Sequence, residues 1–222
     1  FDITTFKPLG KTKAILNSKI RNDREFAQYS ISQNNILAFI EGDSKPELSL
    51  LLLNPINKES ALLSERWQQY GQFSISSSGE KVAVEIVDDQ IYSINIFDIK
   101  RGRFSSFLNS KHNYAPFWGS DGKKIYYTSN RVDPSEFGLY VYDFDQQKEE
   151  EIILEGETMG VLHVSSVSKE GNKLLCFGQQ KGTGMHELYY VDISERKKFQ
   201  LTKNRLQEWG GVFSPDEKWL AY

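Results

Sequence analysis

The three histidines of this 222-residue chain are the side chains best suited to acid–base or metal chemistry. Hydrolysis by a serine needs a histidine beside the nucleophile, and the serine often lies on a sharp G-x-S-x-G turn. The chain contains no such motif, because Ser120 in the run WGSDG follows Trp118 at the first glycine position. His112, His163 and His186 are isolated from one another in the sequence. The sequence therefore predicts no serine hydrolase site.

Metal and cofactor sites are not predicted either. There is no H-E-x-x-H run, and the histidines lack ligand-like spacing. Residues 143–145 (DFD) begin like a calcium loop, but Lys148 and Leu154 replace the required Gly and Glu. The only cysteine, Cys176, lies in an apolar run and is interpreted as a buried, inert thiol. Residues 182–184 (GTG) suggest a loop, not a phosphate cradle. We expect no cofactor and no enzymatic activity.

Composition narrows the possible partners. With 27 Lys and Arg against 30 Asp and Glu, the net charge is −3, which argues against nucleic acid as a partner. The longest apolar run, residues 48–53, is far shorter than the roughly 20 residues that span a bilayer, so we expect no direct membrane insertion. The chain begins at Phe1 and ends at Tyr222 inside a strand-like run. We therefore expect a single domain, residues 1–222, trimmed from a longer protein that could have carried a signal sequence.

The elements that must position any site repeat along the chain. An acid or amide closes a strand-like run at Asp2, Asn54, Asp98, Asp143 and Asp192, with gaps of 52, 44, 45 and 49 residues. A turn pair recurs at residues 33–34, 78–79, 121–122, 170–171 and 216–217. Gaps between these pairs are 45, 43, 49 and 46 residues. Two independent markers thus share a spacing of about 45 residues, which is typical of a four-stranded propeller blade.

Alternation of apolar and polar residues divides each repeat into four strands. The expected ranges are 29–32, 36–40, 47–53 and 60–63; 73–76, 81–86, 91–98 and 103–108; 115–118, 124–128, 139–143 and 150–154; and 162–167, 173–177, 187–192 and 198–202. A polar loop is expected over 129–137, and the run ALLSERW at 61–67 is open to a short helical turn.

The two ends of the chain supply half a blade each. Residues 1–2 and 13–16 suit the third and fourth strands of a blade, and residues 211–213 and 218–222 suit the first and second. Combining them would close a ring and remove its exposed edges. The sequence therefore predicts an all-β protein, a β-propeller of four-stranded antiparallel blades with five blades. The alternative is a six-bladed propeller truncated at both ends.

Residues 116–131 and 200–222 resemble the WD40-like (PD40) repeat of the TolB-like β-propeller family, in which a run such as W-S-P-D-G-K-x-I-x-Y opens each blade. Residues 214–216 and 121–123 match that run closely, 77–79 and 169–171 match partially, and 33–35 depart most. The resemblance covers nearly the whole chain and implies the fold, whereas propellers carry unrelated functions. It also implies a location in the periplasm or at the outer membrane. The family's six-bladed propeller adjoins a second domain, of which these residues show no sign.

In a propeller, the connections between blades and between the second and third strands lie at one face, where loops commonly carry recognition. Large aromatic side chains mixed with Arg and Glu are typical of protein-binding hot spots. The candidates in these connections are Arg24, Glu25, Trp67, Tyr70, His112, Tyr114, Asn130, Arg131, Glu157, Met159, Glu208 and Trp209. The structural alternative is that Trp67, Tyr114 and Trp209 only wedge between neighbouring blades.

These residues predict a non-enzymatic scaffold that binds a protein or peptide. The resemblance implies a partner in the bacterial cell envelope, such as an envelope lipoprotein or a membrane-complex subunit. Two alternatives stay open. One is the gating propeller of a prolyl-oligopeptidase-like hydrolase, whose catalytic domain is absent from these residues. The other is a propeller that binds a small molecule or a sugar, and a deep polar pocket in the channel would favour this function.

Overall fold

The computed structural model describes residues 22–23, 26–27, 29–32, 36–41, 49–54, 56–63, 69–88, 91–133, 136–152, 161–179, 185–203 and 207–222. Every regular element in these ranges is a β-strand. None of them contains a helix long and apolar enough to cross a membrane. The all-β prediction is confirmed.

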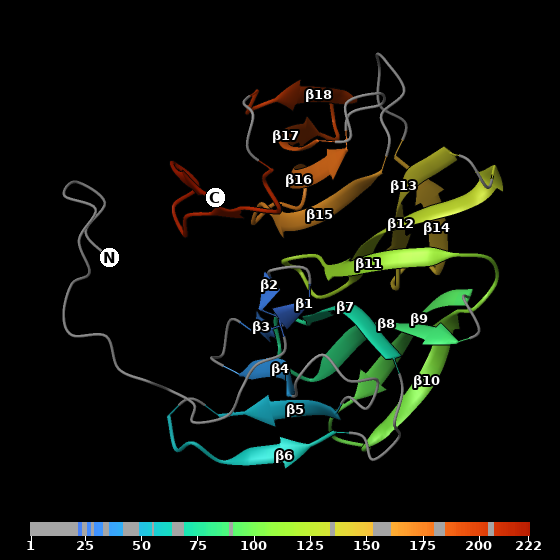
Figure 1. Ribbon diagram of the computed structural model, residues 1–222, viewed down its shortest axis with the longest axis vertical. Coiled ribbons are helices and arrows are strands. Elements are labelled where there is room, and N and C mark those ends of the chain that lie inside the picture. The colour runs from blue at the N-terminus through green and yellow to red at the C-terminus, as the bar shows by residue number, and fades with distance from the viewer. Residues whose placement is uncertain are drawn as a thin grey trace.

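Four antiparallel sheets of four strands follow one another along the chain (Figure 1). Blade 1 contains β3 (Tyr29–Ile31), β4 (Leu37–Glu41), β5 (Ser49–Leu53) and β6 (Ser60–Leu62). Blade 2 contains β7 (Gln69–Ile75), β8 (Lys81–Asp88), β9 (Ile91–Asp98) and β10 (Arg103–Leu108). Blade 3 contains β11 (Asn113–Trp118), β12 (Lys124–Asp133), β13 (Glu136–Asp143) and β14 (Lys148–Glu151). Blade 4 contains β15 (Leu162–Val167), β16 (Lys173–Gln179), β17 (His186–Asp192) and β18 (Lys197–Gln200).

The first strand of each blade packs against the first strand of the next, from β3 to β7, β11, β15 and on to β19 (Val212–Phe213). The blades therefore fan around a common centre with their first strands innermost, as Figure 1 shows. Strand β19 pairs with β20 (Leu220–Ala221) and begins a further sheet. Its expected companions, residues 1–2 and 13–16, lie outside the described residues, so the choice between five and six blades stays a prediction. A short hairpin, β1 (Asn22–Asp23) and β2 (Phe26–Ala27), was not predicted.

The acid or amide markers of the repeat close the turn between the third and fourth strands. The Asp98 carboxylate accepts a hydrogen bond from the Arg101 amide at 2.9 Å, and Asp192 accepts one from the Glu195 amide at 3.0 Å. Asn54 and Asp143 act in the same way, whereas Asp2 lies outside the described residues. Such side-chain turns need a short acceptor at one fixed position, which explains the spacing. The calcium-like run at Asp143 is therefore one of these turns.

Serines join neighbouring blades at a repeated position. Ser30 Oγ accepts the Ile75 amide at 3.1 Å, Ser74 Oγ the Trp118 amide at 3.0 Å, and Ser166 Oγ the Phe213 amide at 3.2 Å. Each serine lies two residues before the residue whose amide closes the turn to the second strand of its blade. The sequence carries this period as well, although we did not predict it.

Phe117 takes the serine position in blade 3, and its seam with blade 4 is joined differently. There, side-chain hydroxyl groups of blade 3 donate hydrogen bonds to backbone carbonyl groups of blade 4. Ser120 Oγ donates to the Ser168 carbonyl at 2.8 Å, and the Tyr126 hydroxyl donates to the Gly171 carbonyl at 2.9 Å.

Several strand boundaries differ from those expected, among them two in blade 3. Strand β12 runs to Asp133, where a polar loop was predicted to begin at residue 129. Ser129 donates to the His112 carbonyl and Arg131 bonds within blade 3, so the polarity of these side chains does not mark a loop. Strand β14 covers Lys148–Glu151, earlier than the predicted 150–154. The run at 61–67 begins as strand β6 through Leu62, and residues 64–67 lie outside the described part.

Candidate functional site

The loop rim is the end of the propeller at which the first strand of each blade begins and the second strand ends. Seven of the predicted site residues are described: Tyr70, His112, Tyr114, Asn130, Arg131, Glu208 and Trp209. The other five, Arg24, Glu25, Trp67, Glu157 and Met159, lie outside the described residues.

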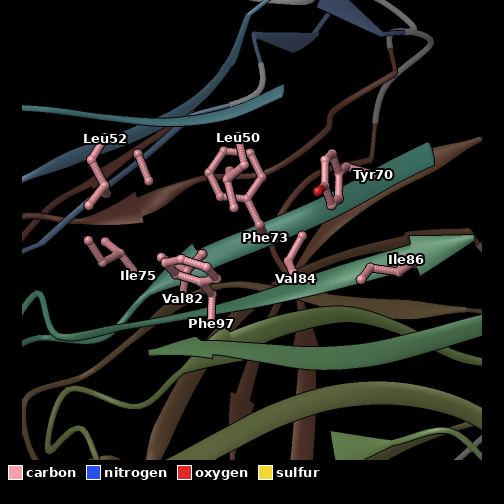
Figure 2. Close-up of a cluster of buried hydrophobic side chains, with 10 residues drawn as sticks. Leu50, Leu52, Tyr70, Phe73, Ile75, Val82, Val84, Ile86 and Phe97 are labelled. Carbon is pink, nitrogen blue, oxygen red and sulfur yellow. The ribbon is translucent and has the colours of Figure 1, made fainter. Parts of the chain in front are cut away.

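Tyr70 is not a rim contact. It lies inside β7, and only 4% of its surface is exposed. Figure 2 shows its ring beside Phe73 and Leu50, in the apolar cluster between blades 1 and 2. The prediction placed it in the preceding connection, but β7 begins at Gln69, earlier than expected.

Arg131 belongs to a polar network inside blade 3. Its guanidinium donates to Tyr127 Oη at 2.9 Å, to Asn113 Oδ1 at 3.1 Å and to Ser129 Oγ at 3.3 Å, and it forms an ion pair with Glu149. It also lies over the Tyr140 ring, 4.5 Å from the ring centroid. Four of its five N–H groups are thus used within the chain. Arg131 was predicted to bind a partner at the rim, but most of its donors are used within blade 3, and the neighbouring Asn130 is buried.

His112 and Tyr114 join an aromatic cluster at the seam between blades 2 and 3. The Tyr114 ring lies 4.6 Å from the Tyr92 ring, 5.6 Å from Phe137 and 6.1 Å from His112, between centroids. All four rings are half-buried. Burial, the Tyr92 hydroxyl and the Glu85 carboxylate together raise the pKa of Tyr114, so its hydroxyl stays protonated at neutral pH.

Trp209 lies in a second cluster, between blade 4 and the sheet that β19 begins. Its indole stacks on the His186 imidazole with centroids 3.7 Å apart, and it meets the Phe177 ring edge-on at 6.3 Å. The Glu208 amide donates to the His186 carbonyl at 3.0 Å, which fixes the connection that carries the indole. The Phe177 ring in turn lies beside the His163 imidazole, with ring centroids 5.3 Å apart.

The two clusters are joined by Thr128. Tyr114 and Thr128 are opposite one another in the pairing of β11 with β12, and Thr128 Oγ1 lies 3.2 Å from His163 Nδ1. All three histidines of the chain therefore lie along one band of rings at the loop rim, all of them half-buried except Phe177, which is buried. We call this the rim band: Tyr92, His112, Tyr114, Phe137, His163, Phe177, His186 and Trp209. The histidines are separated in the sequence, but sheet order brings together residues that are distant in sequence.

A sequence signal for this band exists, although it was missed. Gly71, Tyr114, His163 and Trp209 each lie five residues before the residue that closes the turn to the second strand. They are equivalent positions on successive innermost strands. In blade 2 the equivalent position is Gly71, and the Glu85 carboxylate occupies the space that a side chain would take. A Cβ at Gly71 would lie 2.2 Å from Glu85 Oε1. The Glu85 carboxylate also accepts the Ala115 amide at 2.9 Å, across the seam.

Thr128 carries a hydroxyl within hydrogen-bond distance of a histidine, but it is buried and donates its proton to the Leu162 carbonyl at 2.5 Å, so it is not arranged as a nucleophile. No group of three metal-ligating side chains gathers within the described residues. Partly exposed aromatic rings and imidazole nitrogens are groups that proteins commonly use in recognition.

Acid should destabilise the fold through His163. Burial, and then the nearby His186, lower the pKa of His163 from 6.5 to about 4. Between about pH 6.5 and pH 4 this histidine is protonated in the unfolded chain but neutral in the folded chain. The free energy of unfolding therefore falls across that window by up to about 3 kcal/mol. His163→Gln keeps a donor toward Thr128 and should remove much of this loss. Urea unfolding at pH 7 and pH 4.5 measures it, and equal acid losses in both proteins would contradict the prediction.

No protein-family model and no curated protein sequence matches the chain. TolB from Acinetobacter baumannii is similar in structure, with a TM-score of 0.72, 17% identity, and coverage of 88% of this chain and 47% of that one. This chain thus spans about half of that TolB.

Two further solved structures are similar. A putative TolB from Agrobacterium tumefaciens gives a TM-score of 0.66 at 16% identity, over 86% of this chain and 71% of that one. A prolyl endopeptidase gives 0.57 at 17% identity, over 84% of this chain and 30% of that one. Identities this low establish the fold alone. In fold, the chain is a TolB-like β-propeller.

Proposed function

We propose that the rim band binds a protein or peptide and that the chain is a non-enzymatic scaffold. The observation that supports this is the gathering of half-exposed aromatic and imidazole rings from three consecutive blades at the end where the loops lie. Rings that are packed on one side and accessible on the other lose little conformational freedom on binding, and they dominate protein interfaces.

Seam packing and binding are compatible roles for these rings. Tyr114 contacts Tyr92 of the preceding blade, and Trp209 contacts Phe177 and His186 of the preceding blade, as the wedge interpretation expects. Both rings nevertheless keep part of their surface open to solvent. A pre-packed ring is a rigid anchor, which favours rather than opposes a binding role.

Likeness to TolB structures supports a place in the bacterial cell envelope for this scaffold. We propose an envelope lipoprotein or a membrane-complex subunit as its partner. The near-balanced net charge of −3 fits a protein surface better than a nucleic acid.

Capture from envelope extract tests the proposal. The immobilised chain is compared with a Tyr114→Leu/Trp209→Leu variant and with Trp219→Leu, whose side chain is 57% exposed and lies next to the turn that joins β19 to β20. We expect one envelope protein to bind the wild type and the Trp219 variant, and to be lost from the rim variant while its melting stays cooperative. Equal capture by all three proteins would refute the rim as the site.

A second candidate rests on the likeness to a prolyl endopeptidase and to the propeller domain of the trilobed protease from Pyrococcus furiosus. In that case the propeller would gate access to a hydrolase domain. A full-length product that carries a G-x-S-x-G motif and cleaves peptides would favour this function over the scaffold.

A further inference from the structure

We propose that His163 presents its Nε2 atom as a fixed hydrogen-bond acceptor at the rim band. The rim is then selective for a partner group that carries a neutral N–H or O–H donor. The selectivity rests on the proposed function, whereas the state of the imidazole is a property of the free protein.

The tautomer follows from the bonds of Thr128. A threonine hydroxyl has one proton, and in Thr128 it is directed to the Leu162 carbonyl, 2.5 Å away. Toward His163 Nδ1, at 3.2 Å, the same oxygen can then act only as an acceptor. Nδ1 must therefore carry the ring proton. In a neutral imidazole this leaves the lone pair on Nε2.

The imidazole is neutral at neutral pH, because burial and the nearby His186 lower its pKa to about 4. Thr128 is the only hydrogen-bond partner that His163 has within the described residues. The lone pair on Nε2 is thus unused. Nε2 is not among the fully buried, unpaired side-chain atoms of the described residues, so it keeps some surface within reach of a partner.

The surroundings of His163 favour a neutral donor. The Phe177 ring lies 5.3 Å away, and Phe177 also contacts the Trp209 indole. No third ligand for a metal ion gathers in the described part of the chain. A peptide N–H or a hydroxyl group beside apolar surface meets both requirements, since it supplies the missing donor without bringing a charge into an aromatic site.

Nuclear magnetic resonance of the free protein tests the tautomer. In the chain labelled with ¹⁵N-histidine, two-bond proton–nitrogen correlations at pH 7 should show His163 protonated at Nδ1 and bare at Nε2. Thr128→Val removes the acceptor and should shift the ring toward the Nε2–H tautomer, whereas Thr128→Ser should preserve the wild-type pattern. An Nε2–H pattern in the wild type would overturn the proposal.

Access to Nε2 is tested with diethyl pyrocarbonate, which acylates unprotonated imidazole nitrogen. We expect the wild type at pH 7 to be modified at His163 Nε2, as mapped by mass spectrometry, and full protection would overturn the exposed-acceptor claim. Neither measurement uses a partner. Confirmation of both together with a failed capture would therefore refute the proposed function and leave the state of His163 standing.

Discussion

Gly178→Ala is expected to lower the free energy of unfolding by about 3 kcal/mol, the upper end of the usual cost of overpacking a rigid site, which is about 1–3 kcal/mol. Gly178 lies near the end of β16 and pairs with Leu162 of β15. A Cβ built there would lie 2.2 Å from the Val161 carbonyl oxygen and 2.8 Å from Leu162 Cδ2. The first obstacle is backbone, so relief requires β15 to move away from β16, and β15 carries His163.

Gly102→Ala is the matched control. This glycine has a φ of +63° but no neighbour within 4 Å of the added methyl group. It should lose only about 1 kcal/mol, the cost of placing alanine in the left-handed region. Denaturant unfolding of both variants measures the difference. Equal losses would mean that the close approach at Gly178 is relieved without moving the strand.

Arg131→Met is expected to lower the free energy of unfolding by about 2–3 kcal/mol, somewhat less than the loss of one partner from a fully buried pair. The variant keeps the aliphatic stem over the Tyr140 ring but leaves Glu149 without its counter-charge and Asn113 Oδ1 without a donor. Tyr127 also donates to Glu149, so Glu149 keeps one hydrogen bond in the variant. Because the ion pair is partly exposed, water compensates for part of the loss.

Arg101→Met supplies the comparison for this variant. Arg101 pairs with Asp98 at 2.9 Å, but its side chain is 67% exposed, and such surface pairs contribute little to stability because water and salt screen them. Thermal unfolding of both variants in low and high salt separates the two cases. A loss at Arg131 no larger than the loss at Arg101 would show that the blade 3 network adds no stability.

The fold was readable from the sequence because its repeat markers act locally. Asp98 and Asp192 bond amides three residues away, so the same short pattern must recur wherever the turn recurs. The predicted strand boundaries were wrong where polar side chains bond to residues that are distant in the sequence. The polar run around Arg131 resembled a loop, although its side chains bond to one another across β11, β12 and β14.

The site was only partly readable. Tyr114 and Trp209 were found because large aromatic residues in a connection are conspicuous, but nothing local joins His163 to His186. Those two histidines lie on β15 and β17, with β16 between them, and the indole of Trp209 comes from the following connection. Their proximity depends on sheet order and blade order together. An alignment of the repeats at the turn would have placed Tyr114, His163 and Trp209 at equivalent positions.

The seams between the blades also bear on how the chain assembles. Blades of similar shape risk docking in the wrong order, a characteristic failure of repeat proteins. Ser30 and Ser74 offer acceptors to the amides of the next blade, whereas Ser120 and Tyr126 offer protons to its carbonyls. If blade 3 docked where blade 2 belongs, Phe117 would face an amide that needs an acceptor. The reversed hydrogen-bond polarity of the seam between blades 3 and 4 thus disfavours an arrangement in which blades 2 and 3 exchange places.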